Sequence, residues 1–499
     1  MSVPVSSGGP GVGRRATAGV FWLTAQKWAT RVLGFVTIAV LTRLLSPEDF
    51  GTVAAASTVL PFFFLFADLG FAAYIVQAKR VDQRMLSTAF WFSLGAGVAL
   101  CLVMIALAPA LGLLFRNNDV VPIIQALSIW VVLTAFGSVP MAILRRDMRF
   151  SVIALQGAGA AVVAQVIALI LAFSGAGAWT LVVQSLVGPA IMSALAWMTT
   201  RWHPQRTFVR SDFFAMASFG GKVLVVEFVA MLRALGEAVV ISATLGVGAF
   251  GYMTIAQRLV QVVQDMSGSA IVPVTQVAFA KIRDDAERLR SAYLRASRLI
   301  YFALALPLTI VAVAAPLIIP IIFGDGWEQS YQVAQILALT GIMSVSAWLD
   351  HGLFYGTGKP GVWLLYALII DALTLGTTLA LAHMGLVAIA FGFLGVCIVA
   401  TVTRWFLTSR LLATRAGVVA GPFWFVAVVV IASGTAGWAV KEATAALPPF
   451  ISLIFIGFAV LIVHLVATRV IAPQVLPEAA SMLARSKAGA RVPYLRRFA

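Results

Sequence analysis

The sequence VLTRLLSPEDFG at residues 40–51 is repeated 200 residues later, in diverged form, as VISATLGVGAFG at residues 240–251. Leu45, Phe50 and Gly51 are matched by identical residues in the second copy. Each copy joins the end of one long apolar segment to the start of the next through a tight turn. The chain is therefore predicted to contain two related halves.

On both sides of these turns the chain consists of apolar segments long enough to cross a bilayer. About 20 helical residues span about 30 Å of hydrocarbon, and fourteen segments reach that length. Uninterrupted apolar runs favour helices, because barrel strands alternate apolar and polar residues. The expected spans are residues 17–42, 50–77, 86–115, 121–144, 151–173, 177–199, 213–244, 248–278, 299–322, 329–356, 361–382, 386–409, 421–440 and 449–472.

Composition agrees with a membrane protein, since the mean hydropathy is +0.99 and only 11% of residues are charged. These values exclude a soluble globular protein. The predicted fold class is an all-α polytopic membrane protein of about 14 transmembrane helices, with two six-helix lobes related by pseudo-two-fold symmetry. Its expected parts are an N-terminal tail at 1–16, an N-lobe at 17–200, a C-lobe at 201–415, two extra C-terminal helices at 416–472 and a basic tail at 473–499.

The formal net charge of +16 is distributed unevenly between the two sets of loops. If the amino end lies in the cytoplasm, Arg43, Arg116 and Lys441 are the basic residues of the outer loops, and the other loops and tails are on the cytoplasmic side. Lys and Arg are retained in cytoplasmic loops, so this asymmetry predicts cytoplasmic termini in the plasma (inner) membrane. A nucleic-acid partner is excluded, because the charge is spread over short loops and forms no solvated face.

Five bases are expected well inside the spans, away from their ends, and they are the candidate functional residues. Each would cost about 2.5–3.5 kcal/mol at the bilayer centre unless it faced protein or water. Lys27 and Arg31 are four residues apart and share a helix face. Lys222 and Arg233 are eleven residues apart, about three turns, and also share a face. Ligand binding is the favoured interpretation, and buried ion pairs are the alternative. The five are Lys27, Arg31, Lys222, Arg233 and Arg258.

Other polar residues are expected near these bases. A glutamine stripe on the span at 248–278 is predicted to hydrogen-bond sugar hydroxyls, and consists of Gln257, Gln261 and Gln264. Carboxylates well inside the spans, away from their ends, are expected to serve either as counter-ions or as sites for a coupling proton or sodium ion. They are Asp68, Glu227, Glu237, Asp265 and Asp371. Glu237 is spaced for an ion pair with Arg233, so the counter-ion interpretation is favoured there.

Nothing in the sequence indicates a cofactor, a metal or a catalytic site. Cys101 and Cys397 lie in separate apolar spans, and the four histidines are scattered. Residues 246–251 fit G-x-G-x-x-G but join two spans and follow no strand. The chain is therefore expected to be a transporter and not an enzyme.

The chain resembles the bacterial polysaccharide-transport flippases of the multidrug/oligosaccharidyl-lipid/polysaccharide exporter superfamily, in the colanic-acid-type branch. The motifs that carry the resemblance are TRLLSPEDFG at 42–51, DLGF at 68–71, TAFWF at 88–92, FAKIRDD at 279–285 and FGDGW at 323–327. The resemblance implies translocation of an undecaprenyl-diphosphate-linked oligosaccharide between leaflets. It also implies contacts with membrane lipids and with a polysaccharide polymerase or export machinery.

The stretch TRVLGF at residues 30–35 also resembles the first helix of the lipid II flippases of the same superfamily. That resemblance implies that Arg31 lines a central cationic cavity. A second arginine of those relatives corresponds to Thr37 here, so their full cluster is not reproduced.

These observations predict alternating access around a cavity that binds the diphosphate through the five embedded bases. The alternatives are a drug or small-molecule exporter of the same superfamily, a non-transporting scaffold of a glycan-assembly complex and a membrane-embedded glycosyltransferase. The last is disfavoured because the outer loops hold no clustered acids or metal ligands.

Overall fold

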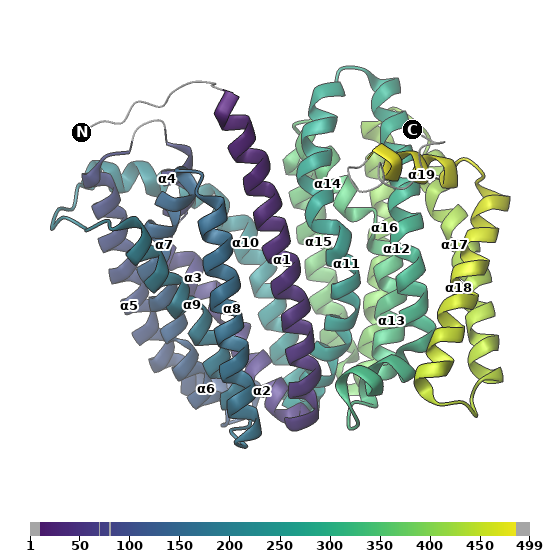
Figure 1. Ribbon diagram of the computed structural model, residues 1–499, viewed down its shortest axis with the longest axis horizontal. Coiled ribbons are helices and arrows are strands. Elements are labelled where there is room, and N and C mark those ends of the chain that lie inside the picture. The colour runs from purple at the N-terminus through teal and green to yellow at the C-terminus, as the bar shows by residue number, and fades with distance from the viewer. Residues whose placement is uncertain (1–9, 69, 79–80, 486–499) are drawn as a thin grey trace. The chain divides into compact units, whose positions relative to one another are not determined.

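The computed structural model describes residues 10–68, 70–78 and 81–485, and within the helices a few further side chains lie outside this description. In the described ranges every regular element is a helix, which confirms the all-α fold class (Figure 1). Ten of these helices are long and apolar enough to cross a membrane. The chain is therefore a multi-pass membrane protein, and the count of fourteen spans stays a prediction.

The described chain forms two compact units, residues 1–251 and residues 252–499, which we call unit 1 and unit 2. The lobe boundary expected at residue 200 stays a prediction. The helices of unit 1 are α1 (Pro10–Leu44), α2 (Pro47–Ser57), α3 (Leu60–Asp68), α4 (Phe71–Gln77), α5 (Gln83–Phe115), α6 (Val120–Leu127), α7 (Ile129–Arg146), α8 (Phe150–Phe173), α9 (Trp179–Thr200) and α10 (Arg210–Leu245).

The next helix, α11 (Val247–Ile282), begins in unit 1 and continues into unit 2. The other helices of unit 2 are α12 (Ala286–Phe323), α13 (Gln329–Ser344), α14 (Ala347–Gly356), α15 (Pro360–Leu381), the short 3₁₀ helix η1 (Ala382–Met384), α16 (Leu386–Leu411), α17 (Ala416–Ala443), α18 (Pro449–Ile471) and α19 (Val475–Arg485).

Every expected span falls on a helix or on a series of short helices. The span expected at 50–77 is not continuous, because it is divided into α2, α3 and α4, and Gly70 before α4 has a left-handed φ of 72°. A broken helix leaves backbone carbonyls without helical partners. Arg146 at the end of α7 donates from Nη1 to the carbonyls of Ile75 (2.7 Å) and Ala78 (2.6 Å), and so satisfies the end of α4.

In unit 1, α1 packs along α8 (Figure 1). Gly157 permits the close approach, since a Cβ there would lie 2.9 Å from Nε2 of Gln26. Farther along α8, Gln165 accepts a hydrogen bond from Gln184 of α9 at 2.9 Å. Glutamine side chains thus connect neighbouring helices where water is scarce, as is common in membrane-protein packing.

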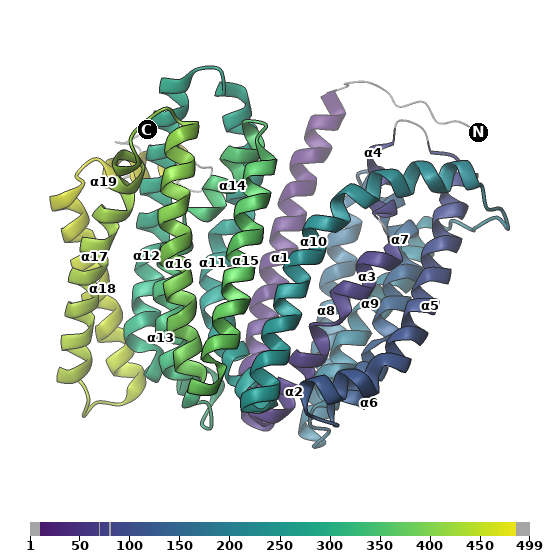
Figure 2. The same cartoon turned by 180° about the vertical axis from the view of Figure 1, so that it is seen from behind.

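In unit 2, α12 packs against α13, α17 and α18, while α17 and α18 form an antiparallel pair beside it (Figure 2). Gly437 lets that pair approach closely, because a Cβ there would lie 2.6 Å from Cγ2 of Val460. Many apolar side chains of α17 and α18 are exposed, among them Trp424 and Phe458. Such faces are expected for helices that contact lipid.

The repeated turn at residues 40–51 is built by capping. Ser46 accepts a hydrogen bond from the Asp49 amide and its own amide donates to the Asp49 carboxylate, forming a capping box at the start of α2. The other carboxylate oxygen of Asp49 accepts from the amide of Ala178 at 2.9 Å. One side chain therefore fixes the start of α2 and holds it against the start of α9.

We predict that Asp49→Ala lowers the free energy of unfolding by about 1–2 kcal/mol, the usual cost of losing an N-terminal cap. Asp119 is a matched control, because it stands at the N-cap of α6 but makes no side-chain cap hydrogen bond there. Thermal unfolding of the two purified variants in detergent measures the difference. Equal melting temperatures for Asp49→Ala and Asp119→Ala would contradict the role assigned to Asp49.

Candidate functional site

The first helix carries Arg31 on the flank of its packing face. Thr37 and Leu41 of α1 are buried, whereas Val32 and Val36 are exposed. Arg31 is half-buried between these two faces. Thr37, the position that corresponds to a second arginine of the lipid II flippases, therefore faces protein. Lys27 was expected beside Arg31, and its side chain lies outside the described residues.

The next candidate bases belong to α10. Arg233 forms an ion pair with Glu237 one turn later, as their spacing predicts. The Glu237 side chain is 10% exposed and that of Arg233 is 32% exposed, so the arginine keeps access from outside the helix. The pair gives Glu237 a counter-ion. The side chains of Lys222 and Glu227 lie outside the described residues.

The polar stripe of α11 divides into two groups. Gln257, Arg258 and Gln261 are exposed. Gln264 is half-buried and its amide donates to Oγ of Ser344 on α13 at 3.3 Å, so it connects two helices of unit 2. Of the remaining candidate carboxylates, Asp371 is half-buried on α15. The side chains of Asp68 and Asp265 lie outside the described residues.

The most deeply buried charges of the described chain belong to a pair that the sequence prediction did not include. Asp350 of α14 and Arg404 of α16 lie in unit 2, with side chains that are 2% and 4% exposed. Nε of Arg404 lies 3.2 Å from Oδ2 of Asp350, as an ion pair but out of line for a hydrogen bond. The same carboxylate accepts hydrogen bonds at Oδ1 from Tyr293 (2.5 Å) and Thr408 (3.1 Å).

The guanidinium of Arg404 is also well supplied with partners. Its Nη2 donates to the Met343 carbonyl at 3.2 Å and to Oγ1 of Thr401 at 3.0 Å. Because the carboxylate and guanidinium are both surrounded by hydrogen-bonding partners, the desolvation cost of the pair is offset. The cluster joins α12, α13, α14 and α16, and it is a structural centre of unit 2.

Asp350 and Arg404 both lie inside expected spans, at 329–356 and 386–409, but within six residues of the expected end, so the predicted set of embedded charges does not include them. Arg404 precedes the expected end of its span at residue 409 by five residues, where a long basic side chain usually reaches the interface. The signal that reveals it is periodicity: Thr401, Arg404 and Thr408 are spaced three and four apart, so they share one face of α16. All three are buried.

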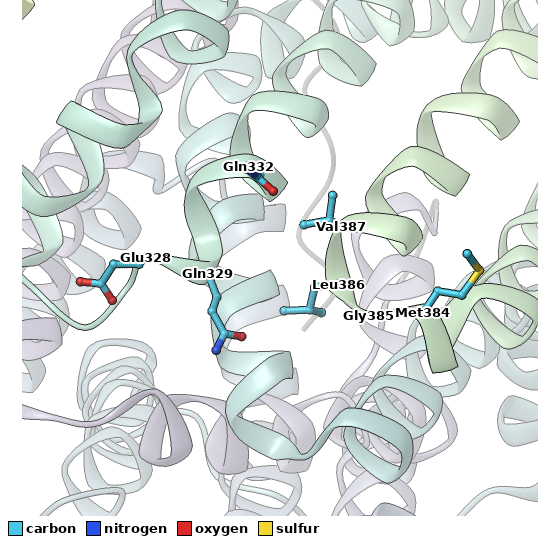
Figure 3. A pocket seen from close by; sticks show the side chains of 7 residues that line it. All are labelled: Glu328, Gln329, Gln332, Met384, Gly385, Leu386 and Val387. Atoms are coloured by element: carbon cyan, nitrogen blue, oxygen red, sulfur yellow. The ribbon is translucent and has the colours of Figure 1, made fainter.

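Unit 2 also has an open cavity of about 280 Å³ at the starts of α13 and α16 (Figure 3). Its lining is polar on the α13 side and consists of Glu328, Gln329 and Gln332, opposite residues 384–387. These three polar side chains are exposed, and Glu328 already accepts a hydrogen bond from the Gly326 amide. Within the described part of the chain, no three His, Cys, Asp or Glu side chains gather in a way that could hold a metal ion.

Several known proteins are similar to this chain over more than half of its length. The family described as "Polysaccharide biosynthesis protein" matches residues 40–332. The succinoglycan biosynthesis transport protein ExoT of Rhizobium meliloti is 28% identical, over 78% of this chain and 78% of its own. The lipopolysaccharide biosynthesis protein WzxC of Escherichia coli is 24% identical, over 76% and 77%. The teichuronic acid biosynthesis protein TuaB of Bacillus subtilis is 23% identical, over 80% and 83%.

Solved structures agree on the fold. The lipid II flippase MurJ in an inward closed conformation matches with a TM-score of 0.75 at 12% identity, over 91% of this chain and 99% of its own. An inward-facing multidrug resistance transporter of the MATE family, in the MOP superfamily, matches with a TM-score of 0.54 at 17% identity, over 79% and 95%. At these identities the likeness concerns the fold alone.

We predict that Arg404→Met lowers the free energy of unfolding by about 3–5 kcal/mol, because it leaves Asp350 buried without its partner. The control is Arg410→Met, a substitution of an exposed arginine on the same helix. Thermal unfolding in detergent should show a large loss for the first and little for the second. The double variant Asp350→Leu, Arg404→Met should lose less than the two single variants combined. Additive losses would contradict the pairing.

Proposed function

The chain belongs to the polysaccharide biosynthesis protein family, within the multidrug/oligosaccharidyl-lipid/polysaccharide exporter superfamily, and from that premise we propose that it is a flippase. Its substrate is an undecaprenyl-diphosphate-linked oligosaccharide repeat unit. The protein moves this unit from the cytoplasmic to the outer leaflet of the plasma (inner) membrane, with both of its termini in the cytoplasm. The product is used for a cell-surface polysaccharide.

The names of the relatives support this proposal. Succinoglycan, lipopolysaccharide and teichuronic acid differ in their sugars. What their precursors share, in our proposal, is a diphosphate that joins the glycan to a lipid. A protein that serves such different polymers would therefore recognise the diphosphate first and the sugars second.

The observation that carries the proposal is the placement of arginines on membrane helices. A diphosphate cannot cross about 30 Å of hydrocarbon unless its charge is compensated. Arg31 is half-buried on α1, and Arg258 is exposed on α11. Guanidinium groups form forked hydrogen bonds with phosphate oxygens, which makes arginine well suited to hold this group.

We assign different roles to the candidate residues. Arg31, Arg258, Lys27 and Lys222 hold the diphosphate, and Gln257 and Gln261 hydrogen-bond the sugar hydroxyls. Arg233 already has Glu237 as its counter-ion, so it joins the site by exchanging that carboxylate for a phosphate oxygen. Gln264 has the lesser role, because its amide is engaged by Ser344.

Movement in this proposal is alternating access, with the polyprenyl tail remaining in the lipid while the headgroup passes through the protein. Asp68, Glu227, Asp265 and Asp371 are the candidates for binding a coupling proton or sodium ion, since carboxylates inside membrane helices commonly serve such paths. A polysaccharide polymerase on the outer side would consume the product and so pull the equilibrium outward.

We predict that Arg31→Ala and Arg258→Ala each reduce flipping by about 10- to 100-fold, because a hydrogen bond to a charged group contributes about 1.5–3 kcal/mol. Proteoliposomes with a fluorescent undecaprenyl-diphosphate-linked oligosaccharide measure the rate. Arg415→Ala is the control, because Arg415 is exposed in a connection between helices. Wild-type rates for a double Arg31→Ala, Arg258→Ala variant would rule out a cationic path, and transport of cationic drugs instead would favour the drug exporter.

A further inference from the structure

The two copies of the internal repeat touch each other inside unit 1. A Cβ atom added to Gly51 of α2 would lie 1.7 Å from the carbonyl oxygen of Val247, at the start of α11. A Cβ atom added to Gly251 of α11 would lie 2.2 Å from the carbonyl oxygen of Pro47, at the start of α2. Both positions therefore require glycine, because no side-chain atom fits between the two backbones.

The contact is reciprocal. Gly51 meets Val247 and Gly251 meets Pro47, and each pair is the other shifted by 200 residues. Such self-complementary contact is the mark of a local two-fold relation, in which residue i meets j and the equivalent of j meets the equivalent of i. The sequence repeat is thus also a physical contact, made by the first turns of two helices.

Each side of this contact is a rigid helix start. The first turn of α2 is held by the capping box of Ser46 and Asp49, and Asp49 also accepts from the amide of Ala178. The first turn of α11 follows Gly246, whose left-handed φ of 91° separates it from α10. Rigid backbones in contact cannot absorb an added atom by side-chain rotation, so they must move apart.

The position of the contact gives it a functional meaning. In the predicted orientation both turns lie at the outer ends of their helices, on the side where the flipped headgroup leaves. Arg258 and Gln257 follow about two turns farther along α11.

We propose that the backbone contact of Gly51 and Gly251 is a closed outer gate, which separates to release the headgroup. This inference rests on the proposed function, and it adds that the gate closes only because neither glycine carries a Cβ. A single methyl group at either position then holds the gate open. Transport would fail in such a variant because the closed state is lost, although the cationic residues remain.

A labelling experiment tests the gate without any transport assay. The reporter is Gln257→Cys, exposed to a membrane-impermeant maleimide added on the outer side of intact cells. The native Cys101 and Cys397 are buried and do not report. We expect Gly51→Ala or Gly251→Ala to raise the labelling rate about tenfold, equivalent to about 1.4 kcal/mol.

Gly95→Ala is the matched control, because a Cβ there meets nothing within 4 Å. It should leave labelling unchanged. Equal labelling of the Gly51→Ala, Gly251→Ala and Gly95→Ala proteins in the membrane would overturn the gate.

A cross-link provides the complementary test, in case an alanine variant fails to fold. A Cβ at residue 248 would lie 3.5 Å from Cγ of Glu48, the position that a cysteine sulfur would occupy, so cysteines at the two positions are within reach of each other. In the double variant Glu48→Cys, Gly248→Cys we expect oxidation to join α2 and α11 and to reduce flipping at least tenfold. A thiol reductant should restore the rate, and each single cysteine variant should be unaffected by oxidation.

The two tests separate the gate from the proposed function. Absence of the cross-link, or full flipping by the cross-linked protein, would show that no gate opens at this contact. If the wild type itself moves no lipid-linked oligosaccharide, the proposed function is wrong, and the labelling experiment still decides whether the contact opens.

Discussion

A charged or polar group inside a membrane must have a partner or water, and this constraint organises the protein. The described chain satisfies it in two ways, each with an ion pair. The Asp350–Arg404 pair is sealed within unit 2 among hydroxyl groups and a backbone carbonyl. The Arg233–Glu237 pair remains partly open on α10. We infer that the sealed pair holds the helices of unit 2 together, and the proposed ligand contacts are assigned to bases that stay exposed, such as Arg258.

Backbone groups obey the same constraint. Where α4 ends inside a broken helix, Arg146 supplies the hydrogen bonds that a continuous helix would have made. At the repeated turn the problem is steric, and glycine at residues 51 and 251 allows two helix starts to meet without side chains. The long side chain of Arg146 and the missing side chains of the two glycines therefore both stabilise an architecture of interrupted helices.

The helices could be predicted because a run of about 20 apolar residues in a bilayer has few other conformations that satisfy its backbone hydrogen bonds. The helix breaks at Gly70 and between α13 and α14 could not be predicted, because apolar residues continue on both sides of each break. The pairing of Arg233 with Glu237 followed from spacing along one helix, whereas Asp350 and Arg404 come from different helices and meet only through packing. A tertiary contact of this kind gives a weak signal in a single sequence. The signal here is the polar face of α16.

We propose above all that the protein carries a lipid-linked oligosaccharide across the membrane. The most direct measurement is the leaflet distribution of undecaprenyl-diphosphate oligosaccharides in cells that lack the protein. We expect these lipids to accumulate on the cytoplasmic leaflet, and we expect the wild-type protein to restore their passage. A lipid-linked pool unchanged in amount and in leaflet would contradict the proposal.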